Sequence, residues 1–167
     1  ALHALLRAVE AGKQGAMLAP TEILARQHLA SLQASLSVYS GRPKLLGSKW
    51  FEGDAPTMWR SLGKLMTLPD ATRVYCGHEY TLSNLKFALA VEPHNVDLIA
   101  YEQTCQALRA SDRPTLPSNL TQELNINPFL RTRSPSVVQA ARQFDPALAQ
   151  RPDDDVAVFA AIREWKN

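Results

Sequence analysis

Apolar residues recur along most of this chain at three- and four-residue intervals, the spacing of an amphipathic helix. The clearest set is Leu98, Tyr101, Cys105 and Leu108, which follows Asn95, a residue that favours the position before a helix. From residue 54 onward the pattern predicts a succession of helices with short breaks. The helices are expected at 55–67, 81–91, 96–110, 119–125, 136–143 and from Asp153 or Asp154 to about Lys166. The apolar side of the helix at 81–91 is expected to carry Leu82, Leu85, Ala88 and Leu89.

Two short runs have the apolar, β-favouring character of strands instead. Residues 15–19 form one such run, closed by Pro20, and residues 72–76 form the other. The first 40 residues predict the order helix, strand, helix, strand, which is typical of a parallel α/β sheet. We expect the strands at 15–19 and 72–76 to share a small sheet, so the predicted fold class is α/β and rich in helix.

The best candidate joint between domains lies at residues 41–48, where two glycines and a proline occur close together. It divides the chain into a segment of residues 1–40 and a longer region of residues 49–167. A chain of 167 residues is long enough for one domain plus a fragment of another.

Composition narrows the classes of function. The charged fraction is 20% and the net charge is +2, with acids and bases interspersed, so neither nucleic acid nor a membrane surface is an expected partner. No apolar run approaches the roughly 20 residues that cross a bilayer. The two cysteines, Cys76 and Cys105, do not form a CxxC pair. We expect both to be buried, reduced thiols in a cytoplasmic protein.

The most specific chemistry lies in residues 74–81, where a β-like run ends in Gly77 and His78 and turns directly into a helix. A histidine at the end of a strand projects into the crevice above a sheet, which is a common place for a metal ligand. The alternative is an imidazole that is hydrogen-bonded near the strand end and binds no metal.

The run Gly77-His78-Glu79-Tyr80-Thr81 resembles a signature of glyoxalase II, the hydroxyacylglutathione hydrolase family. From Lys49 to the end of the chain, further stretches are similar to that family in the same order and at the same spacing. These stretches are residues 51–53, 63–69, 84–88, 91–93, 113–118, 127–131 and 158–166.

This resemblance implies a partial metallo-β-lactamase-type sheet fragment followed by the helical C-terminal domain of glyoxalase II. Members of that family use two metal ions, zinc or iron, to activate a hydroxide. The hydroxide hydrolyses the thioester S-D-lactoylglutathione to glutathione and D-lactate, a step of methylglyoxal detoxification. The implied partner is therefore a glutathione thioester.

The resemblance also implies site residues. His78 matches a ligand of the second metal ion, whereas Lys49, Tyr80, Arg163 and Lys166 match positions that bind the glutathione moiety. The carboxylates of glutathione favour such cationic partners. The alternative for Arg163 and Lys166 is a dipole effect, because cations in the last turn stabilise a helix by roughly 0.3–1 kcal/mol without any ligand. No residue is assigned a catalytic role.

The other metal ligands of that family are missing from this sequence: a His-x-His-x-Asp-His cluster, a further histidine and a bridging aspartate. One histidine cannot hold two metal ions. We therefore expect the chain by itself to be inactive, unless a partner chain completes the site. The alternatives are a non-catalytic domain that binds glutathione thioesters and a chimeric domain without function.

Residues 1–40 resemble a different family, the RecG-type DNA helicases. The similarity includes residues 17–28, which match a helicase motif whose strand-to-helix turn contacts the DNA backbone in that family. The phosphate-binding loop and the acidic Walker-B strand are missing, so nothing in the sequence would hold a nucleotide. A DNA-contacting fragment is the least favoured alternative.

Overall fold

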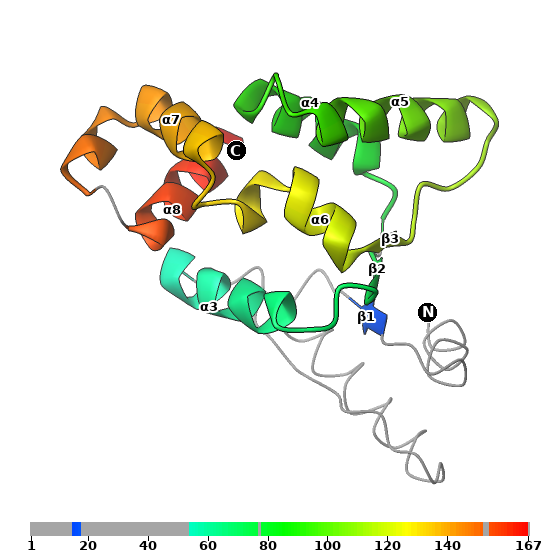
Figure 1. Cartoon of the computed structure of the whole chain (residues 1–167), viewed down its shortest axis with the longest axis horizontal. Coiled ribbons are helices and arrows are strands. Elements are labelled where there is room, and N and C mark those ends of the chain that lie inside the picture. Colours follow the sequence, from blue (N-terminus) through cyan, green and yellow to red (C-terminus); the bar gives the residue numbers. More distant parts are fainter. Residues whose placement is uncertain (1–14, 18–53, 77, 152–153, 167) are drawn as a thin grey trace, which may run out of the picture. The chain divides into compact units, whose positions relative to one another are not determined.

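The computed structural model describes residues 15–17, 54–76, 78–151 and 154–166 (Figure 1). Its contacts group into two compact units, and we describe each by itself. The first, called here the strand unit, comprises residues 1–78 and 116–120; the second, the helical unit, comprises residues 79–115 and 121–167.

Several predictions from the sequence lie outside the described residues. They include most of the helicase-like segment, the joint at 41–48 and the glutathione-binding prediction for Lys49. The resemblance of residues 1–40 to a helicase and the predicted division of the chain into domains therefore stay predictions.

The strand unit contains a sheet of three short strands in the order β1-β2-β3 among the described residues. β1 (Gly15–Met17) pairs in parallel with β2 (Arg73–Tyr75), and β2 pairs antiparallel with β3 (Ser118–Asn119). The predicted sharing of one sheet by the first two strands is thus confirmed. β3 was not predicted, because two residues are too few to show an alternating pattern.

One helix of the strand unit, α3 (Ala55–Met66), begins as the sequence predicts. The side chain of Asp54 accepts a hydrogen bond from the Thr57 backbone N–H at 2.9 Å, which satisfies one of the free donors at the helix start. Pro56 lies in the first turn, where a missing N–H costs nothing. Leu62 is the buried apolar residue of this helix.

The helical unit consists of short helices joined by tight connections, as the periodicity predicts. Two of its helices, α4 (Thr81–Val91) and α5 (Val96–Ala110), have the predicted bounds to the residue. The others are α6 (Leu120–Ile126), whose first residue belongs to the strand unit, η1 (Pro128–Leu130), α7 (Pro135–Phe144), η2 (Pro146–Gln150) and α8 (Asp155–Lys166). No helix in the described part of the chain is long and apolar enough to cross a membrane.

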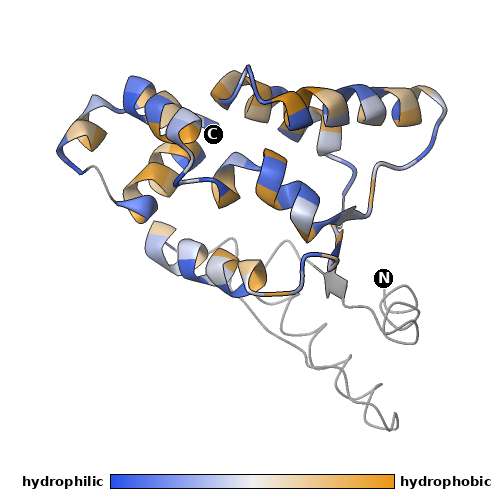
Figure 2. Cartoon of the chain, viewed as in Figure 1, coloured by the Kyte–Doolittle hydropathy of each residue, from blue (hydrophilic) through white to orange (hydrophobic). Residues whose placement is uncertain are grey.

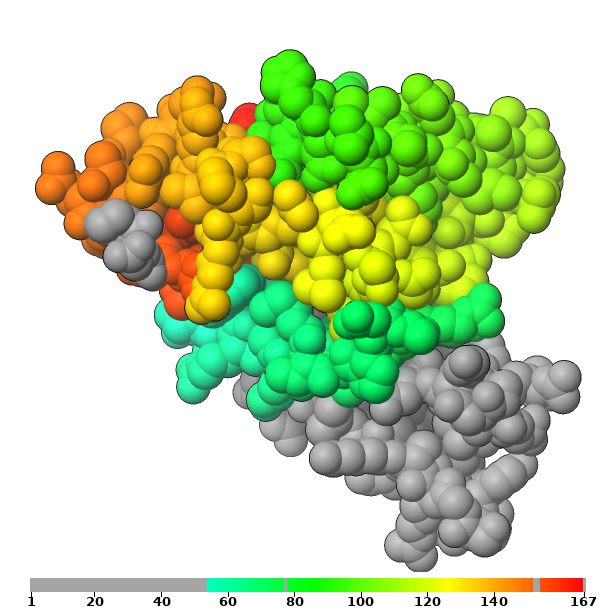
Figure 3. All heavy atoms as spheres, in the orientation of Figure 1, coloured from blue at the N-terminus to red at the C-terminus, as the bar shows by residue number. Residues whose placement is uncertain are grey.

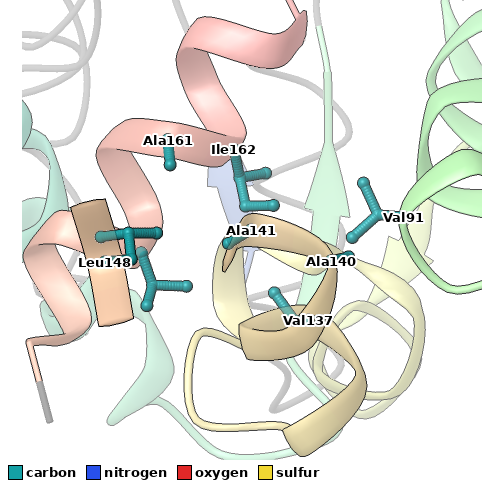
Figure 4. Packing of buried hydrophobic residues seen from close by; sticks show 8 residues of the cluster. Val91, Val137, Ala140, Ala141, Leu148, Ala161 and Ile162 are labelled. Atoms are coloured by element: carbon teal, nitrogen blue, oxygen red, sulfur yellow. The ribbon is translucent and has the colours of Figure 1, made fainter. Parts of the chain in front are cut away.

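One core of the helical unit forms where α7 packs on α8. Its buried residues come from both helices, from η2 and from the end of α4, as Figure 4 shows for Val137, Ile162, Leu148 and Val91. Aromatic rings extend this core: Trp165 stacks on Phe144 at 5.6 Å between ring centroids and meets Phe87 edge-on at 5.8 Å. In Figure 2 the ribbons of α7 and α8 carry both apolar and polar residues.

A second core of the helical unit lies between α4 and α5. Leu85, Ala88, Leu98, Cys105 and Ile126 are all buried in it. The side chains of the two helices form a continuous surface in the space-filling view (Figure 3, green). The predicted apolar face of residues 96–110 is confirmed, since Leu98 and Cys105 are fully buried.

Two predictions about burial were wrong. Cys76 is exposed rather than buried, because β2 ends at Tyr75 and Cys76 belongs to the connection that follows. Leu82 is 37% exposed although the spacing placed it with Leu85 on the inner face of α4. It lies in the first turn of the helix, and the inner face of α4 begins only at Leu85.

A buried ion pair joins the residue that follows α4 to the residue that follows η1. Glu92, whose side chain is 2% exposed, accepts hydrogen bonds from Arg131 Nε at 2.7 Å and Nη2 at 3.1 Å. Ser136 Oγ donates to the same carboxylate at 2.5 Å, and Arg131 Nη1 donates to the Leu124 carbonyl at 3.1 Å. The carboxylate is thus held by a bidentate contact, the strongest geometry for such pairs.

Candidate glutathione-binding site

Tyr80, the aromatic residue of the predicted site, lies at the start of α4. Tyr80 directly precedes the helix, and its side chain is 62% exposed. Its carbonyl accepts a hydrogen bond from the Asn84 N–H at 2.9 Å, so the backbone at Tyr80 already belongs to the first helical turn. Because Asn84 follows Tyr80 by four residues, the two residues share one face of α4.

The last turn of α8 brings a cation to that face. Lys166 Nζ donates a hydrogen bond to Asn84 Oδ1 at 2.7 Å and lies 5.0 Å from the centroid of the Phe87 ring. The second distance is within the range of a cation–π contact. Although much of the Lys166 side chain is exposed, partial desolvation of its ammonium group lowers the pKa below its ordinary value.

Arg163, the other predicted cation, lies in the same last turn of α8 as Lys166 and is half-buried. Residues three apart on a helix are neighbours on its surface, so the two cations belong to one patch. Asn84 contacts the Tyr80 carbonyl through its backbone N–H and Lys166 through its side chain, and the sequence analysis gave this residue no role. The sequence did offer one indication of such a role, because Asn84 lies in the stretch 84–88 that resembles glyoxalase II.

A second group of polar residues surrounds the start of α4. The Thr115 backbone N–H donates to Glu79 Oε2 at 2.9 Å, and Thr115 Oγ1 lies 2.5 Å from Glu79 Oε1. Thr115 Oγ1 also lies 2.6 Å from Thr81 Oγ1. Desolvation acts to raise the pKa of Glu79, but the hydrogen bonds from Thr115 and Thr81 outweigh it and keep the pKa below its ordinary value.

His78, the predicted metal ligand, is an exposed residue of the strand unit that follows β2 by three residues. Among the residues that the structure describes, no three His, Cys, Asp or Glu side chains gather as a metal site requires. The described residues therefore do not by themselves fit the two-metal centre that the glyoxalase II resemblance implies.

Comparison with known proteins gives a consistent result. Residues 79–167 match the family model of the hydroxyacylglutathione hydrolase C-terminus. The chain is similar to the hydroxyacylglutathione hydrolase of Albidiferax ferrireducens, with 55% identity over 117 residues, which are 70% of this chain and 44% of that protein. The hydroxyacylglutathione hydrolase of Nitrosomonas europaea is 49% identical over the same share of each chain.

A third relative, the hydroxyacylglutathione hydrolase of Alkalilimnicola ehrlichii, is 46% identical over 142 residues, which are 84% of this chain and 54% of the relative. The chain spans about half the length of the curated relatives it matches. The family match begins at Glu79 and so covers α4 and α8, the helices that carry Asn84 and Lys166. The resemblance that residues 74–81 predicted is confirmed, and the chain belongs to the hydroxyacylglutathione hydrolase (glyoxalase II) family, whose C-terminal domain it carries.

Proposed function

We propose that this chain takes part in the hydrolysis of hydroxyacylglutathione thioesters and that its helical unit binds the glutathione part of the substrate. Membership of the family supports the substrate class, since the relatives are named for it. The single observation that carries the binding role is the contact of Lys166 with Asn84, one helical turn after Tyr80.

The chemistry of this surface suits glutathione. The ligand carries carboxylates, and α8 ends with two cations, Arg163 and Lys166. An ammonium group has three donors, so a contact with one amide oxygen is compatible with a carboxylate on another donor. The exposed Tyr80 adds a hydroxyl that can donate to a peptide carbonyl or a carboxylate.

The alternative, that Lys166 serves only to stabilise the C-terminal end of α8 through the helix dipole, explains less of the structure. A cation that serves only the helix end needs no fixed side-chain position, because the effect depends on its proximity to the last carbonyls. Lys166 instead points to another helix and contacts both Asn84 and Phe87 on it. Such a fixed position lowers the entropy that the side chain would lose on binding a ligand.

Calorimetric titration of the chain with glutathione tests the proposal. We expect Lys166→Ala to weaken binding by roughly tenfold or more, since hydrogen bonds to charged groups contribute about 1.5–3 kcal/mol. Tyr80→Phe should give a smaller loss. Arg142→Ala is the matched control, because Arg142 is an exposed cation in the last turn of α7.

No heat of binding by the unaltered chain would refute the binding role. An equal loss in Lys166→Ala and Arg142→Ala would assign the effect to overall charge instead. Turnover of S-D-lactoylglutathione, followed by the loss of thioester absorbance, separately tests hydrolysis by this chain alone. The glutathione-binding role of Lys49 stays a prediction, and titration of Lys49→Ala with glutathione tests it in the same way.

A further inference from the structure

Glu79, the residue before Tyr80, makes a long-range polar contact at the start of α4. Both carboxylate oxygens of Glu79 are bound by one residue, Thr115, which is 36 positions further along the chain. One contact uses the Thr115 backbone N–H and the other its hydroxyl. A two-point contact fixes both the distance and the orientation of the segments that it joins.

Thr81, the first residue of α4, belongs to the same group. The Thr115 hydroxyl lies within hydrogen-bond distance of Glu79 and of Thr81, but it has only one proton. When the Thr115 hydroxyl donates to the carboxylate, the Thr81 hydroxyl is the donor of the second contact. Glu79 and Thr81 are therefore both held by Thr115, and Tyr80 lies between them in the chain.

Glu79 itself is exposed, but burial of Thr115 makes the loss of its contacts costly. Thr115 is 6% exposed, so its N–H and hydroxyl have little access to water. Removal of the Glu79 carboxylate would leave two buried donors without this acceptor, which is more expensive than the loss of an exposed hydrogen bond. The backbone around Tyr80 would then be free to rearrange until those donors find water.

The group also lies where the chain passes between units. Glu79 follows the last residue of the first stretch of the strand unit, and Thr115 precedes the second stretch, 116–120. The two residues therefore tie together two of the three points at which the chain passes between the units. A shift at Glu79 is transmitted to Tyr80 through a single peptide bond.

We propose that Glu79 is a positioning residue which, through Thr115 and Thr81, fixes the start of α4 and so holds Tyr80 in place for glutathione. This inference rests on the proposed function, because it concerns the same ligand. Glu79 touches no ligand itself in this role; it acts on Tyr80 and on the first turn of α4, whose closing hydrogen bond runs from Asn84 N–H to the Tyr80 carbonyl.

The test combines glutathione titration with amide hydrogen exchange measured by NMR on the full chain. Thr115→Val removes the hydroxyl at nearly constant volume, and Glu79→Ala removes the carboxylate. We expect both to weaken glutathione binding by about fivefold to tenfold and to accelerate exchange of the Asn84 amide by about tenfold, with each contact worth about 1 kcal/mol. Thr115→Ser, which keeps the hydroxyl, should restore both values.

The outcomes separate this inference from the proposed function. Unchanged Asn84 exchange in Thr115→Val and Glu79→Ala would overturn the positioning role, even if the unaltered chain binds glutathione. A chain that binds no glutathione refutes the proposed function and, with it, the assignment of Tyr80 to that ligand. If Glu79→Ala fails to fold, Glu79→Gln, which keeps one acceptor oxygen, takes its place and should give an intermediate loss.

Discussion

The Glu92–Arg131 pair shows how much depends on a single buried charge. The Arg131 guanidinium binds both oxygens of a carboxylate that is almost without access to water. A buried ion pair adds little net stability compared with an apolar pair, but the removal of one partner leaves the other charge uncompensated. Arg133 and Asp155 form a pair of the same length, 2.7 Å, in the same unit, but the Arg133 side chain is 86% exposed and that of Asp155 is 19% exposed, so water reaches this pair.

We expect Arg131→Met to lower the free energy of unfolding by about 3–5 kcal/mol, because it leaves the Glu92 carboxylate buried and unpaired. Arg133→Met is the matched control and should cost less than about 1 kcal/mol, as exposed pairs do. Urea unfolding followed by circular dichroism measures both changes. Similar losses in the two variants would show that burial is not what makes the first pair important.

We expect the Glu92 carboxylate to make the free energy of unfolding depend on pH. Desolvation acts to raise the pKa of Glu92, but the contacts from Arg131 and Ser136 outweigh it and hold the pKa below its ordinary value. A lowered folded-state pKa stabilises the fold above the ordinary pKa of a glutamate, and this stabilisation is lost as the pH falls through the folded-state pKa. Urea midpoints between about pH 6 and about pH 3 should therefore fall more steeply for the unaltered chain than for Glu92→Gln.

At the scale of the element, the structure explains why some boundaries were predictable and others were not. Asn95 marks the start of α5 in the sequence, and in the structure its side chain accepts a hydrogen bond from the Leu98 N–H at 3.1 Å. Short elements carry no such signal. η1, η2 and β3 have between two and five residues, fewer than the window in which a period can be recognised.

Asn95 has a second contact that a helix-start signal does not predict. Its Nδ2 donates to the Asn125 carbonyl at 2.9 Å and so joins the start of α5 to α6. We expect Asn95→Ala to destabilise the helical unit by about 1–2 kcal/mol, because it removes these two contacts and a longer one, at 3.5 Å, to Glu92. Asn95→Ser keeps an oxygen that can cap the helix and should recover roughly half of the loss in urea unfolding. Equal losses in the two variants would mean that the link to α6 dominates.

At the scale of the whole molecule, the family and the mostly helical architecture could be read from the sequence, but the contacts within the candidate site could not. Tyr80, Arg163 and Lys166 were predicted through resemblance alone. The contact of Lys166 with Asn84 spans 82 positions, and that of Glu79 with Thr115 spans 36. Periodicity is a local property of the chain, so it cannot show which distant residues a fold brings together.

The packing of Trp165 between Phe144 and Phe87 has a practical consequence. The indole directly precedes Lys166 in the chain and touches the same Phe87 ring as the Lys166 ammonium group. Its fluorescence emission therefore reports on the surroundings of that ammonium group without any attached dye. The chain has two other tryptophans, Trp50 and Trp59. Subtracting the emission spectrum of Trp165→Phe from that of the unaltered chain leaves the emission of Trp165, whose change on addition of a ligand can be followed directly.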